Sequence, residues 1–437
     1  MSHRTRKSSP RRAALLGVAA VVGGAFALPA TAAADPVTQC AAADSAIYRP
    51  PGSVTTAPGT VLACRAVDSL PMVVGAPAYH AWKALYASTD GHDNPSAVAG
   101  TVIVPDAPWK GAGERPLVAF APGTLGIGPQ CAFSKQLSGA YQDAYEGPNI
   151  TALLRAGFAV AATDGAGYLD GQVHPYVSGP DAGHAVLDMV RAAARVPGSG
   201  VSPRAQVGIW GYSEGGAGSL WAAQLARSYA PELNVVGVAS GGAPTDLKAA
   251  AANLDGSLFA GFLVDALIGL SATHPDMPFD GILGDAGRRA VRDAKTLCAV
   301  GTVARFAGTR VEQLTADHLS LAQMYALSGP DGTTWSEVAE ESRLGVGVGR
   351  PGSGARYEVG FPVLEYHGLL DEVIPVGSVT VTRNAYCAMG IPVEWKAYGA
   401  DHLLGDARAV NDAVAWLGDR FAHRTVSAPS CRAGNDG

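Results

Sequence analysis

Short apolar runs alternate with longer amphipathic stretches along most of the chain. Most of the short runs are continuously apolar rather than alternating between apolar and polar residues. This pattern is typical of strands that are covered on both faces of a sheet. The pattern predicts strands at residues 98–104, 116–121, 157–162, 207–211, 235–239, 362–366 and 393–398.

Helical periodicity appears between these runs. In 181–195, for example, Ala185, Val186, Met189 and Val190 fall on one face of a helix. We expect helices at 181–195, 216–229 and 407–421. Strands that alternate with helices of this length predict an α/β fold, with a mostly parallel sheet and helices on both of its faces.

Residues 245–355 interrupt the alternation, because about 110 residues pass without a convincing core strand. Helical patterns cover 246–270, 285–306 and 311–327, and a Gly-rich stretch at 345–354 leads back to the sheet. An insertion at this place would lie over the exposed end of the strands. We therefore expect a helical cap, or lid.

The first 34 residues have the pattern of an export signal. Five basic residues precede an apolar stretch at 13–28, and small residues follow at 31–34. The apolar stretch is shorter than the roughly 20 residues of a membrane span. We expect cleavage near Ala34 and a secreted protein, and no later segment is long and apolar enough to span a bilayer. The expected parts are a signal peptide at 1–34, an extended segment at 35–75, the first core part at 76–244, the cap at 245–355 and the second core part at 356–437.

Charge and cysteine content narrow the class of protein. Removal of the signal leaves 27 basic and 38 acidic residues, a net charge of −11, which argues against a nucleic-acid partner. An even number of cysteines in an oxidising compartment predicts three disulfides, and the spacing alone leaves their connectivity open. No Cys-x-x-Cys pair is present, so we expect no metal site. The six cysteines are Cys40, Cys64, Cys131, Cys298, Cys387 and Cys431.

The most specific motif is the hexapeptide Gly-Tyr-Ser-Glu-Gly-Gly at 211–216. It directly follows the apolar run 207–210 and precedes a helical stretch. A strand that ends in Gly-x-Ser-x-Gly and leads into a helix is the signature of a nucleophile elbow, whose tight turn exposes the serine hydroxyl above the sheet. Ser213 is therefore the candidate nucleophile.

A serine nucleophile needs a base and an acid that orients the base, and in this fold class the chain order is serine, acid, histidine. Asp371 follows the run ending at Tyr366, and His402 follows the run ending at Tyr398. Both positions lie at the carboxyl ends of successive strands, the edge at which Ser213 emerges.

Other side chains compete for these two roles. Glu372 and Asp401 are alternative acids or helix-cap carboxylates, and His367 is expected to pack or to orient the loop. His174 and His184 come before the acid, in the wrong chain order. Asp371 and His402 are the preferred acid and base.

Ester hydrolysis also needs donors for the oxyanion of the tetrahedral intermediate. One donor should be the backbone N–H of Glu214, directly after the nucleophile. The other should come from the Gly-rich loop at 121–128, where Gly123 and Thr124 are the candidates and Thr124 is preferred, since its hydroxyl could add a second donor. No lysine follows this loop in the manner of a phosphate-binding motif.

Several of these motifs, taken in order, resemble the secretory lipase family. They are the Gly-Thr-Leu-Gly run at 123–126 with Cys131, the Thr-Asp pair at 163–164 with 165–168, the elbow at 211–216, and His-Gly at 367–368 with 371–375. The resemblance covers roughly residues 75–425. It implies an α/β-hydrolase fold with a helical lid, activity on acyl esters without a cofactor, and a triad of Ser213, Asp371 and His402.

The same resemblance implies that Cys131 bridges to Cys298 in the lid, which leaves Cys40 with Cys64 and Cys387 with Cys431. Some fungal members use an acidic side chain in the oxyanion loop, where this chain has Gly123 and Thr124.

The sequence therefore predicts a secreted carboxylic-ester hydrolase, with a triacylglycerol lipase as the first hypothesis. Its partner would be an acyl ester or lipid, at a lipid–water interface. A short-chain or polyester esterase and an exported serine aminopeptidase are the alternatives on the same fold. The expected cap offers no clear acidic cluster for the amine of a peptide substrate. A non-enzymatic binding protein is the remaining alternative, and an intact set of three residues in the right order argues against it.

Overall fold

A nine-stranded sheet forms the centre of the fold, and it follows the strand–helix alternation of the sequence. The computed structural model describes residues 37–141, 143–426 and 431. The strand order is β1-β2-β3-β5-β4-β6-β7-β10-β11. The strands are β1 Val61–Val67, β2 Tyr79–Thr89, β3 Pro95–Pro105, β4 Leu117–Ala121, β5 Ala159–Thr163, β6 Gln206–Tyr212, β7 Asn234–Gly241, β10 Val363–Gly368 and β11 Val393–Tyr398.

Strand direction divides the sheet into two parts. β1, β2 and β3 pair antiparallel, and β3 pairs antiparallel with β5. From β5 through β4, β6, β7 and β10 to β11 every pairing is parallel. The predicted α/β fold with a mostly parallel sheet is confirmed. Because parallel strands end at the same edge, the loops after β4, β6, β10 and β11 lie close together.

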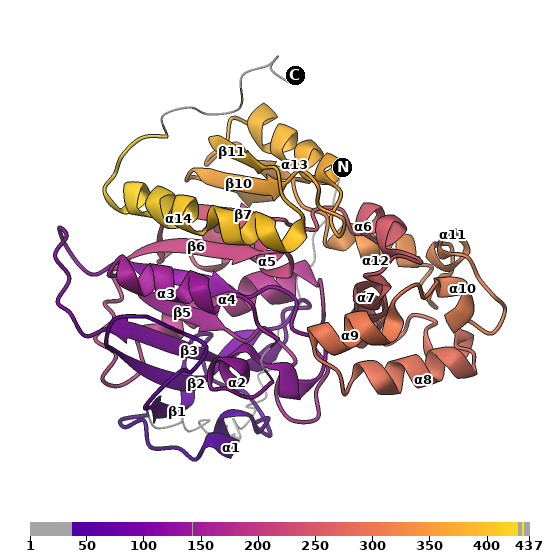
Figure 1. Cartoon of the computed structure of the whole chain (residues 1–437), viewed down its shortest axis with the longest axis horizontal. Helices are drawn as coiled ribbons and strands as arrows, with labels where there is room; N and C mark the ends of the chain where they lie inside the picture. Colours follow the sequence, from indigo (N-terminus) through magenta and orange to yellow (C-terminus); the bar gives the residue numbers. More distant parts are fainter. Residues whose placement is uncertain (1–36, 142, 427–430, 432–437) are drawn as a thin grey trace, which may run out of the picture. The chain divides into compact units, whose positions relative to one another are not determined.

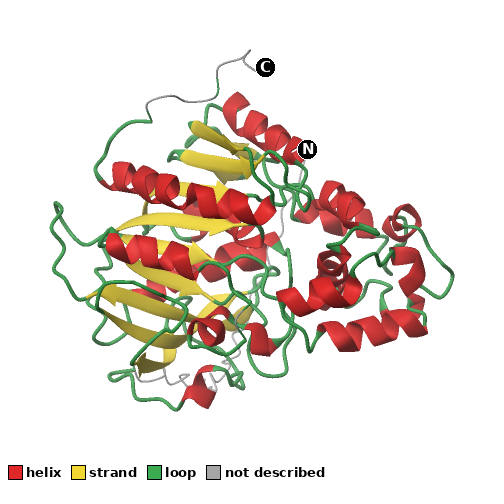
Figure 2. Cartoon of the chain, viewed as in Figure 1, coloured by secondary structure: helices red, strands yellow, loops and turns green. Residues whose placement is uncertain are grey.

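Helices cover both faces of the sheet (Figures 1 and 2). α3 Gly147–Arg155 and α14 His402–Phe421 lie on one face, and α4 Gly179–Ala193 and α5 Glu214–Tyr229 lie on the other. Adjacent residues of β6 serve the two cores, since Ile209 packs with the α4 and α5 side and Trp210 with the α3 and α14 side. The other helices of this part are α1 Asp44–Ile47, η1 Pro129–Cys131, α2 Phe133–Leu137 and α13 Val376–Ala388.

The long insertion is helical, and its helices group beside the ends of the strands (Figure 1). They share an apolar cluster of their own that includes Leu263, Phe306 and Trp335. We call α6 to α12 the cap helices. They are α6 Leu247–Leu254, α7 Ala260–Thr273, η2 Asp280–Ile282, α8 Asp285–Ala294, α9 Ala299–Phe306, α10 Val311–Leu314, α11 Leu321–Tyr325 and α12 Trp335–Glu341.

The predicted helix boundaries in the cap are wrong, because each of the three long patterns is two helices. The pattern at 246–270 breaks at 255–259, where Gly256 takes a φ of 79° that a helix does not permit. The patterns at 285–306 and 311–327 break at 295–298 and 315–320. Apolar periodicity continues across these turns, so it does not reveal them. A small sheet follows the cap helices and precedes β10. Its two strands are β8 Val348–Gly349 and β9 Tyr357–Glu358.

The N-terminal expectations need a second correction. The segment 35–75 contains the edge strand β1, and β1 pairs with β2, which the sequence pattern missed. Lys83 interrupts the apolar run of β2, yet its side chain is buried and its ammonium lies 3.0 Å from Asp44. The predicted signal at 1–34 lies outside the described residues.

The three predicted disulfides are present, with all six cysteines paired. The pairs are Cys131–Cys298, which the family resemblance implied, and Cys40–Cys64 and Cys387–Cys431, which were expected from the remaining cysteines. Cys131–Cys298 joins η1, next to the β4 loop, to the start of α9 in the cap. None of the helices in the described part is long and apolar enough to cross a membrane.

Candidate active site

Ser213 lies in a strained turn between β6 and α5. Its φ of 55° falls in the left-handed region, which is uncommon for a residue with a side chain. A Cβ on Gly211 would lie 2.2 Å from the Gly215 carbonyl oxygen, and one on Gly215 would lie 2.0 Å from that of Ala121. Both positions therefore require glycine, and the local geometry is that of a nucleophile elbow.

Three residues from separate loops meet at this turn. The His402 Nε2 lies 2.9 Å from the Ser213 Oγ, and the His402 Nδ1 lies 2.7 Å from the Asp371 Oδ2. These partners place the ring proton on Nδ1, where it is donated to the carboxylate, and leave Nε2 to accept from the serine hydroxyl. The sequence-predicted serine, acid and histidine are thus hydrogen-bonded in series.

The carboxyl group of Asp371 is buried and fully engaged. Its Oδ1 accepts from the backbone N–H groups of Val373 and Ile374, at 2.9 and 2.8 Å. Burial alone would raise the pKa of Asp371, but the hydrogen bond and charge of His402 hold this pKa below its ordinary value. Asp371 therefore stays ionised through the neutral range.

The two alternative acids have other partners. Glu372 accepts from the backbone N–H of His402 at 3.2 Å, and Asp401 caps α14 by accepting from the Leu404 N–H at 2.8 Å. Neither carboxylate contacts the imidazole ring. They position the loop that carries His402.

His367 is a second histidine at the acid. Its ring is buried and stacks on Trp395, and its Nε2 lies 3.0 Å from the Ile374 carbonyl oxygen and 3.2 Å from the Asp371 Oδ2. Both of these neighbours are acceptors, so Nε2 carries the proton. Burial lowers the pKa of His367, more than the nearby Asp371 carboxylate raises it. A neutral His367 therefore donates to the acid loop, which agrees with the expected orienting role.

The loop after β4 also lies at the nucleophile, because β4 pairs with β6, the strand that leads into Ser213. The Gly123 N–H donates to both carboxylate oxygens of buried Glu146, at 3.0 and 2.9 Å, so this amide is already occupied. The Thr124 hydroxyl is hydrogen-bonded to the Tyr176 hydroxyl at 2.8 Å, which fixes the side chain. Within the described residues the Thr124 backbone N–H has no acceptor, and that of Glu214 is in the first turn of α5, where amides lack intrahelical partners.

Sequence reasoning missed the role of Glu146. Burial raises the pKa of Glu146, and the nearby Asp406 carboxyl raises it further. Burial likewise raises the pKa of Asp406 to about 6. A buried glutamate in the middle of an irregular segment carries no sequence signal of its partner, because the contact joins residues 23 positions apart.

His174, which the chain order sets aside as a base, contacts Glu214, the residue after the nucleophile. Its Nε2 lies 2.5 Å from the Glu214 Oε1 and its Nδ1 lies 2.7 Å from the Ala166 carbonyl oxygen, and the ring stacks on Tyr168. Burial lowers the pKa of His174, but the Glu214 carboxylate reverses this, and the net direction is upward. His174 and Glu214 therefore form a buried ion pair.

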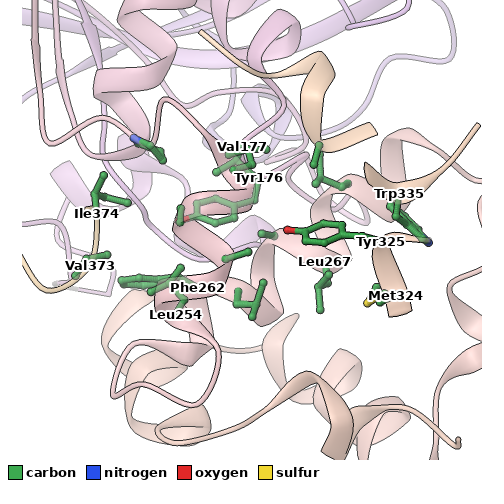
Figure 3. Close-up of a pocket in the computed structure, with 18 of the residues that line it drawn as sticks. Tyr176, Val177, Leu254, Phe262, Leu267, Met324, Tyr325, Trp335, Val373 and Ile374 are labelled. Atoms are coloured by element: carbon green, nitrogen blue, oxygen red, sulfur yellow. The ribbon is translucent and has the colours of Figure 1, made fainter. Parts of the chain in front are cut away.

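Ser213 lines a largely apolar cavity. Its walls come from the cap and from the acid loop. In Figure 3, Leu254 and Phe262 lie beside Val373 and Ile374, and Met324 lies with Trp335 farther along the cavity. No Asp, Glu, Lys or Arg lines the cavity in the part of the chain that the structure describes.

Metal chemistry has no candidate site among the described side chains. No group of three or more His, Cys, Asp or Glu residues there could hold a metal ion. The chemistry that the arrangement can perform is nucleophilic attack by an activated serine.

Comparison with solved structures shows the fold. The chain is similar to lipase A of Candida antarctica, with a TM-score of 0.76 and 24% identity over 88% of this chain and 87% of that one. It is also similar to the cell-wall-degrading esterase LipA of Xanthomonas oryzae, with a TM-score of 0.65 and 16% identity over 84% of this chain and 99% of that one. The fold is that of α/β-hydrolase lipases and esterases.

Sequence comparison gives relatives that span most of the chain. Lipase 10 of Candida albicans is 28% identical over 390 residues, which cover 86% of this chain and 80% of that protein. A secreted triacylglycerol lipase of Malassezia globosa is 28% identical over 86% of this chain and 79% of its own. A probable inactive lipase of Mycobacterium tuberculosis is 30% identical over 88% of this chain and 83% of its own.

The family model described as secretory lipase matches residues 132–428, which is well over half of the chain. This match includes the elbow and the loops that carry the acid and the histidine. The protein belongs to the secretory lipase family and is an ester hydrolase with the α/β-hydrolase fold.

Proposed function

We propose that the protein is a secreted triacylglycerol lipase that acts through a Ser213–His402–Asp371 triad. The observation that carries the proposal is the hydrogen-bonded series of these three side chains, whose serine lines a largely apolar cavity. The series activates a serine, and the cavity suits the acyl chain of an ester.

The first half of the reaction forms an acyl-enzyme. The Ser213 Oγ attacks the ester carbonyl carbon while the His402 Nε2 takes the hydroxyl proton, and Asp371 stabilises the resulting imidazolium. The carbonyl oxygen becomes an oxyanion, which the backbone N–H groups of Glu214 and Thr124 bind. The intermediate collapses, the bond to the alcohol oxygen breaks, and His402 returns its proton to the departing alkoxide.

The second half releases the acid. Water attacks the acyl carbon and gives a proton to the His402 Nε2, and the second oxyanion occupies the same two amides. Collapse breaks the bond to the Ser213 Oγ, which takes the proton back from His402. The products are an alcohol and a carboxylic acid, and the enzyme is unchanged.

The cavity lining favours a long-chain ester over a peptide. An aminopeptidase binds the ammonium group of its substrate with a carboxylate, and the described cavity lining contains none. Each methylene that moves from water into an apolar wall contributes about 0.8 kcal/mol, or roughly a factor of four in affinity. We therefore expect kcat/KM to rise with acyl length until the cavity is filled, whereas a short-chain esterase would show no such rise.

The proposal is tested with the protein secreted from its full-length gene. It should hydrolyse p-nitrophenyl esters of increasing acyl length and emulsified triglyceride, and Ser213→Ala should abolish both activities. Cleavage of chromogenic peptides but not esters, or full activity of Ser213→Ala, would contradict the proposal.

A second variant pair tests the cavity. Ala266→Phe places a ring in the cavity lining and should shift the optimum toward shorter acyl chains. Ala286→Phe makes the same change at an exposed position of α8 and should leave the optimum where it is. An unchanged optimum in Ala266→Phe would show that acyl chains bind elsewhere.

A further inference from the structure

Four side chains in the cavity lining carry an oxygen or nitrogen that can form a hydrogen bond. Within the described residues these are Tyr176, Ser213, Tyr325 and Trp335. Three of the four already have a partner in the protein. The Ser213 hydroxyl is bonded to His402. The Tyr176 hydroxyl is bonded to that of Thr124, and the Trp335 ring N–H donates to a backbone carbonyl oxygen at 3.3 Å.

Tyr325 is the exception in this set. Its hydroxyl forms no hydrogen bond within the part of the chain that the structure describes. In Figure 3 the hydroxyl end of the ring points into the cavity, toward Tyr176. Burial raises the pKa of Tyr325, and the nearby Asp246 carboxylate raises it further, so the phenol keeps its proton at neutral pH. The hydroxyl can therefore both donate and accept a hydrogen bond.

The cap holds this hydroxyl in place. Tyr325 is the last residue of α11, whose first turn is capped by Ser320 and Gln323. The preceding Met324 is buried in the apolar cluster of the cap, and the ring of Tyr325 packs against the same cluster. A polar group that is already positioned loses little freedom when it binds, and such groups orient ligands in apolar pockets.

An unsubstituted alkyl chain leaves the Tyr325 hydroxyl unpaired. When such a chain fills the cavity, the hydroxyl loses contact with water, and a methylene cannot replace the lost hydrogen bond. A chain that carries its own hydroxyl group at the same depth restores the bond. Sites that hydrogen-bond a substrate hydroxyl discriminate strongly against the analogue that lacks it. The Tyr325 hydroxyl therefore favours a hydroxylated chain.

The place of Tyr325 in the cavity determines where along the chain that hydroxyl must lie. Tyr176 lies at the oxyanion loop, since its hydroxyl is bonded to Thr124. In Figure 3, Tyr325 lies with Trp335, away from Val373 and Ile374 of the acid loop. The triad and the oxyanion loop hold the ester group. The part of the acyl chain that reaches Tyr325 is therefore not the part next to the ester carbonyl.

We propose that Tyr325 is a specificity-determining residue that selects esters of acyl chains with a hydroxyl group distant from the ester carbonyl. This inference rests on the proposed function, since the chain occupies the cavity while Ser213 cleaves its ester. The Tyr325 hydroxyl exchanges a hydrogen bond with the hydroxyl of the chain, and the apolar walls contact the methylenes on either side of it. The bonds that form and break at the ester are unchanged.

The selectivity of the parent protein is the first test. Pairs of soluble ethyl esters have the same acyl length and differ by one hydroxyl group, which stands near the ester, in the middle of the chain or at its far end. Release of the free acid is followed by chromatography, so that internal lactone formation is not counted. The ratio of kcat/KM for the hydroxylated ester to that for its unsubstituted partner should be about 10-fold higher at one distant position than near the ester.

Tyr325→Phe is the second test, because it removes the hydroxyl and keeps the ring. This variant should lower the highest ratio about 10-fold, through a loss on the hydroxylated ester and no loss on the unsubstituted one. Tyr141→Phe is the matched control, since Tyr141 is 56% exposed and does not line the cavity, and it should change the ratio less than 2-fold. Tyr176→Phe should affect both esters of a pair alike. Thermal unfolding within a few degrees of the parent shows that each variant is folded.

Two results would overturn the proposal. The first is a ratio in the parent that is the same at all positions of the hydroxyl, and the second is an unchanged ratio in Tyr325→Phe. If the parent cleaves no ester, the proposed function fails. Calorimetric binding of the hydroxylated and unsubstituted free acids to Ser213→Ala, with and without Tyr325→Phe, then still tests the role of Tyr325.

Discussion

His174 forms a 2.5 Å hydrogen bond with Glu214, the residue that directly follows the nucleophile Ser213. The two ring nitrogens of His174 face oxygen atoms of Glu214 and Ala166, and the Glu214 carboxylate raises the pKa of His174, which favours the protonated ring. Glu214 thereby has its side chain fixed while its backbone N–H remains available to an oxyanion. The pair connects the loop after β5 to the first turn of α5.

His174→Gln should lower kcat about 10-fold and change KM less than 2-fold. An oxyanion donor acts only when charge develops in the transition state, and removal of a donor costs on the order of 3 kcal/mol, so its displacement costs less. Steady-state kinetics on a soluble ester measures both constants. His184→Gln is the control, because His184 is equally buried on α4 and contacts Asp90 instead. A KM effect without a kcat effect would contradict the positioning role.

The same pair predicts a pH dependence of stability. Because the pKa of His174 is raised by Glu214, the pair stabilises the fold fully below the ordinary histidine pKa of about 6.5, and this contribution is lost as the pH rises through the raised pKa. The free energy of unfolding of the parent should therefore fall more steeply on this alkaline side than that of His174→Gln. Urea titrations at several pH values test this.

Asp371→Asn should lower kcat about 10⁴-fold, because an amide would hold the imidazole in the wrong tautomer. Glu372→Gln and Asp401→Asn should each cost less than 10-fold, since these side chains contact only backbone N–H groups. Each of the three substitutions replaces one carboxylate oxygen by an amide nitrogen, so the kcat values of the variants on one soluble ester can be compared directly. A larger loss in Glu372→Gln than in Asp371→Asn would assign the acid to Glu372.

His367→Phe should lower kcat about 10-fold and reduce the acid sensitivity of the fold. The phenyl ring can keep the stack on Trp395, but it gives no N–H to Asp371 or to the Ile374 carbonyl. Since burial lowers the pKa of His367, the neutral ring stabilises the fold above about pH 6.5, and this contribution is lost as the pH falls through the lowered pKa. The variant lacks this titration, so its free energy of unfolding should fall less than that of the parent as the pH drops below about 6.5. If the free energy of unfolding depends on pH in the same way in both proteins, neutral His367 does not stabilise the fold.

Glu146→Ala and Glu146→Gln form a pair that tests the oxyanion loop. The alanine variant leaves the buried Gly123 N–H without an acceptor, which costs about 1–3 kcal/mol of stability and should lower kcat. The glutamine variant keeps an acceptor, and the raised pKa of Glu146 favours a neutral side chain at this place. The free energy of unfolding and kcat should therefore be similar in the parent and in Glu146→Gln, and both should be lower in Glu146→Ala. Equal effects of the two substitutions would show that the carboxylate charge itself is needed.

Removal of the Cys131–Cys298 disulfide by a double serine substitution should lower the free energy of unfolding by about 5 kcal/mol in the chain-entropy account, given its separation of 167 residues. The same change at Cys40–Cys64, with a separation of 24 residues, should cost about 3–4 kcal/mol. Denaturant titrations give both free-energy losses from the midpoint and the slope of each unfolding transition. A larger loss for the shorter loop would point to local packing instead of chain entropy.

Much of the core and the set of serine, acid and histidine could be predicted because they depend on local sequence. The elbow at Ser213 needs glycines at fixed spacing, and strand ends place Asp371 and His402. The strand β2 was missed because its buried Lys83 is neutralised by Asp44, a partner 39 residues away. The roles of Glu146 and His174 could not be predicted for the same reason, since each side chain acts through a contact that only the folded chain creates.

The Cys131–Cys298 bond also restricts how access to Ser213 can change. It fixes the start of α9 to the segment beside the oxyanion loop, so the cap cannot lift away from the core as a free body. At the acid loop, by contrast, the Asn253 amide holds α6 with two hydrogen bonds. Any movement of the cap must therefore keep the start of α9 beside the oxyanion loop, while the two hydrogen bonds at the acid loop can break.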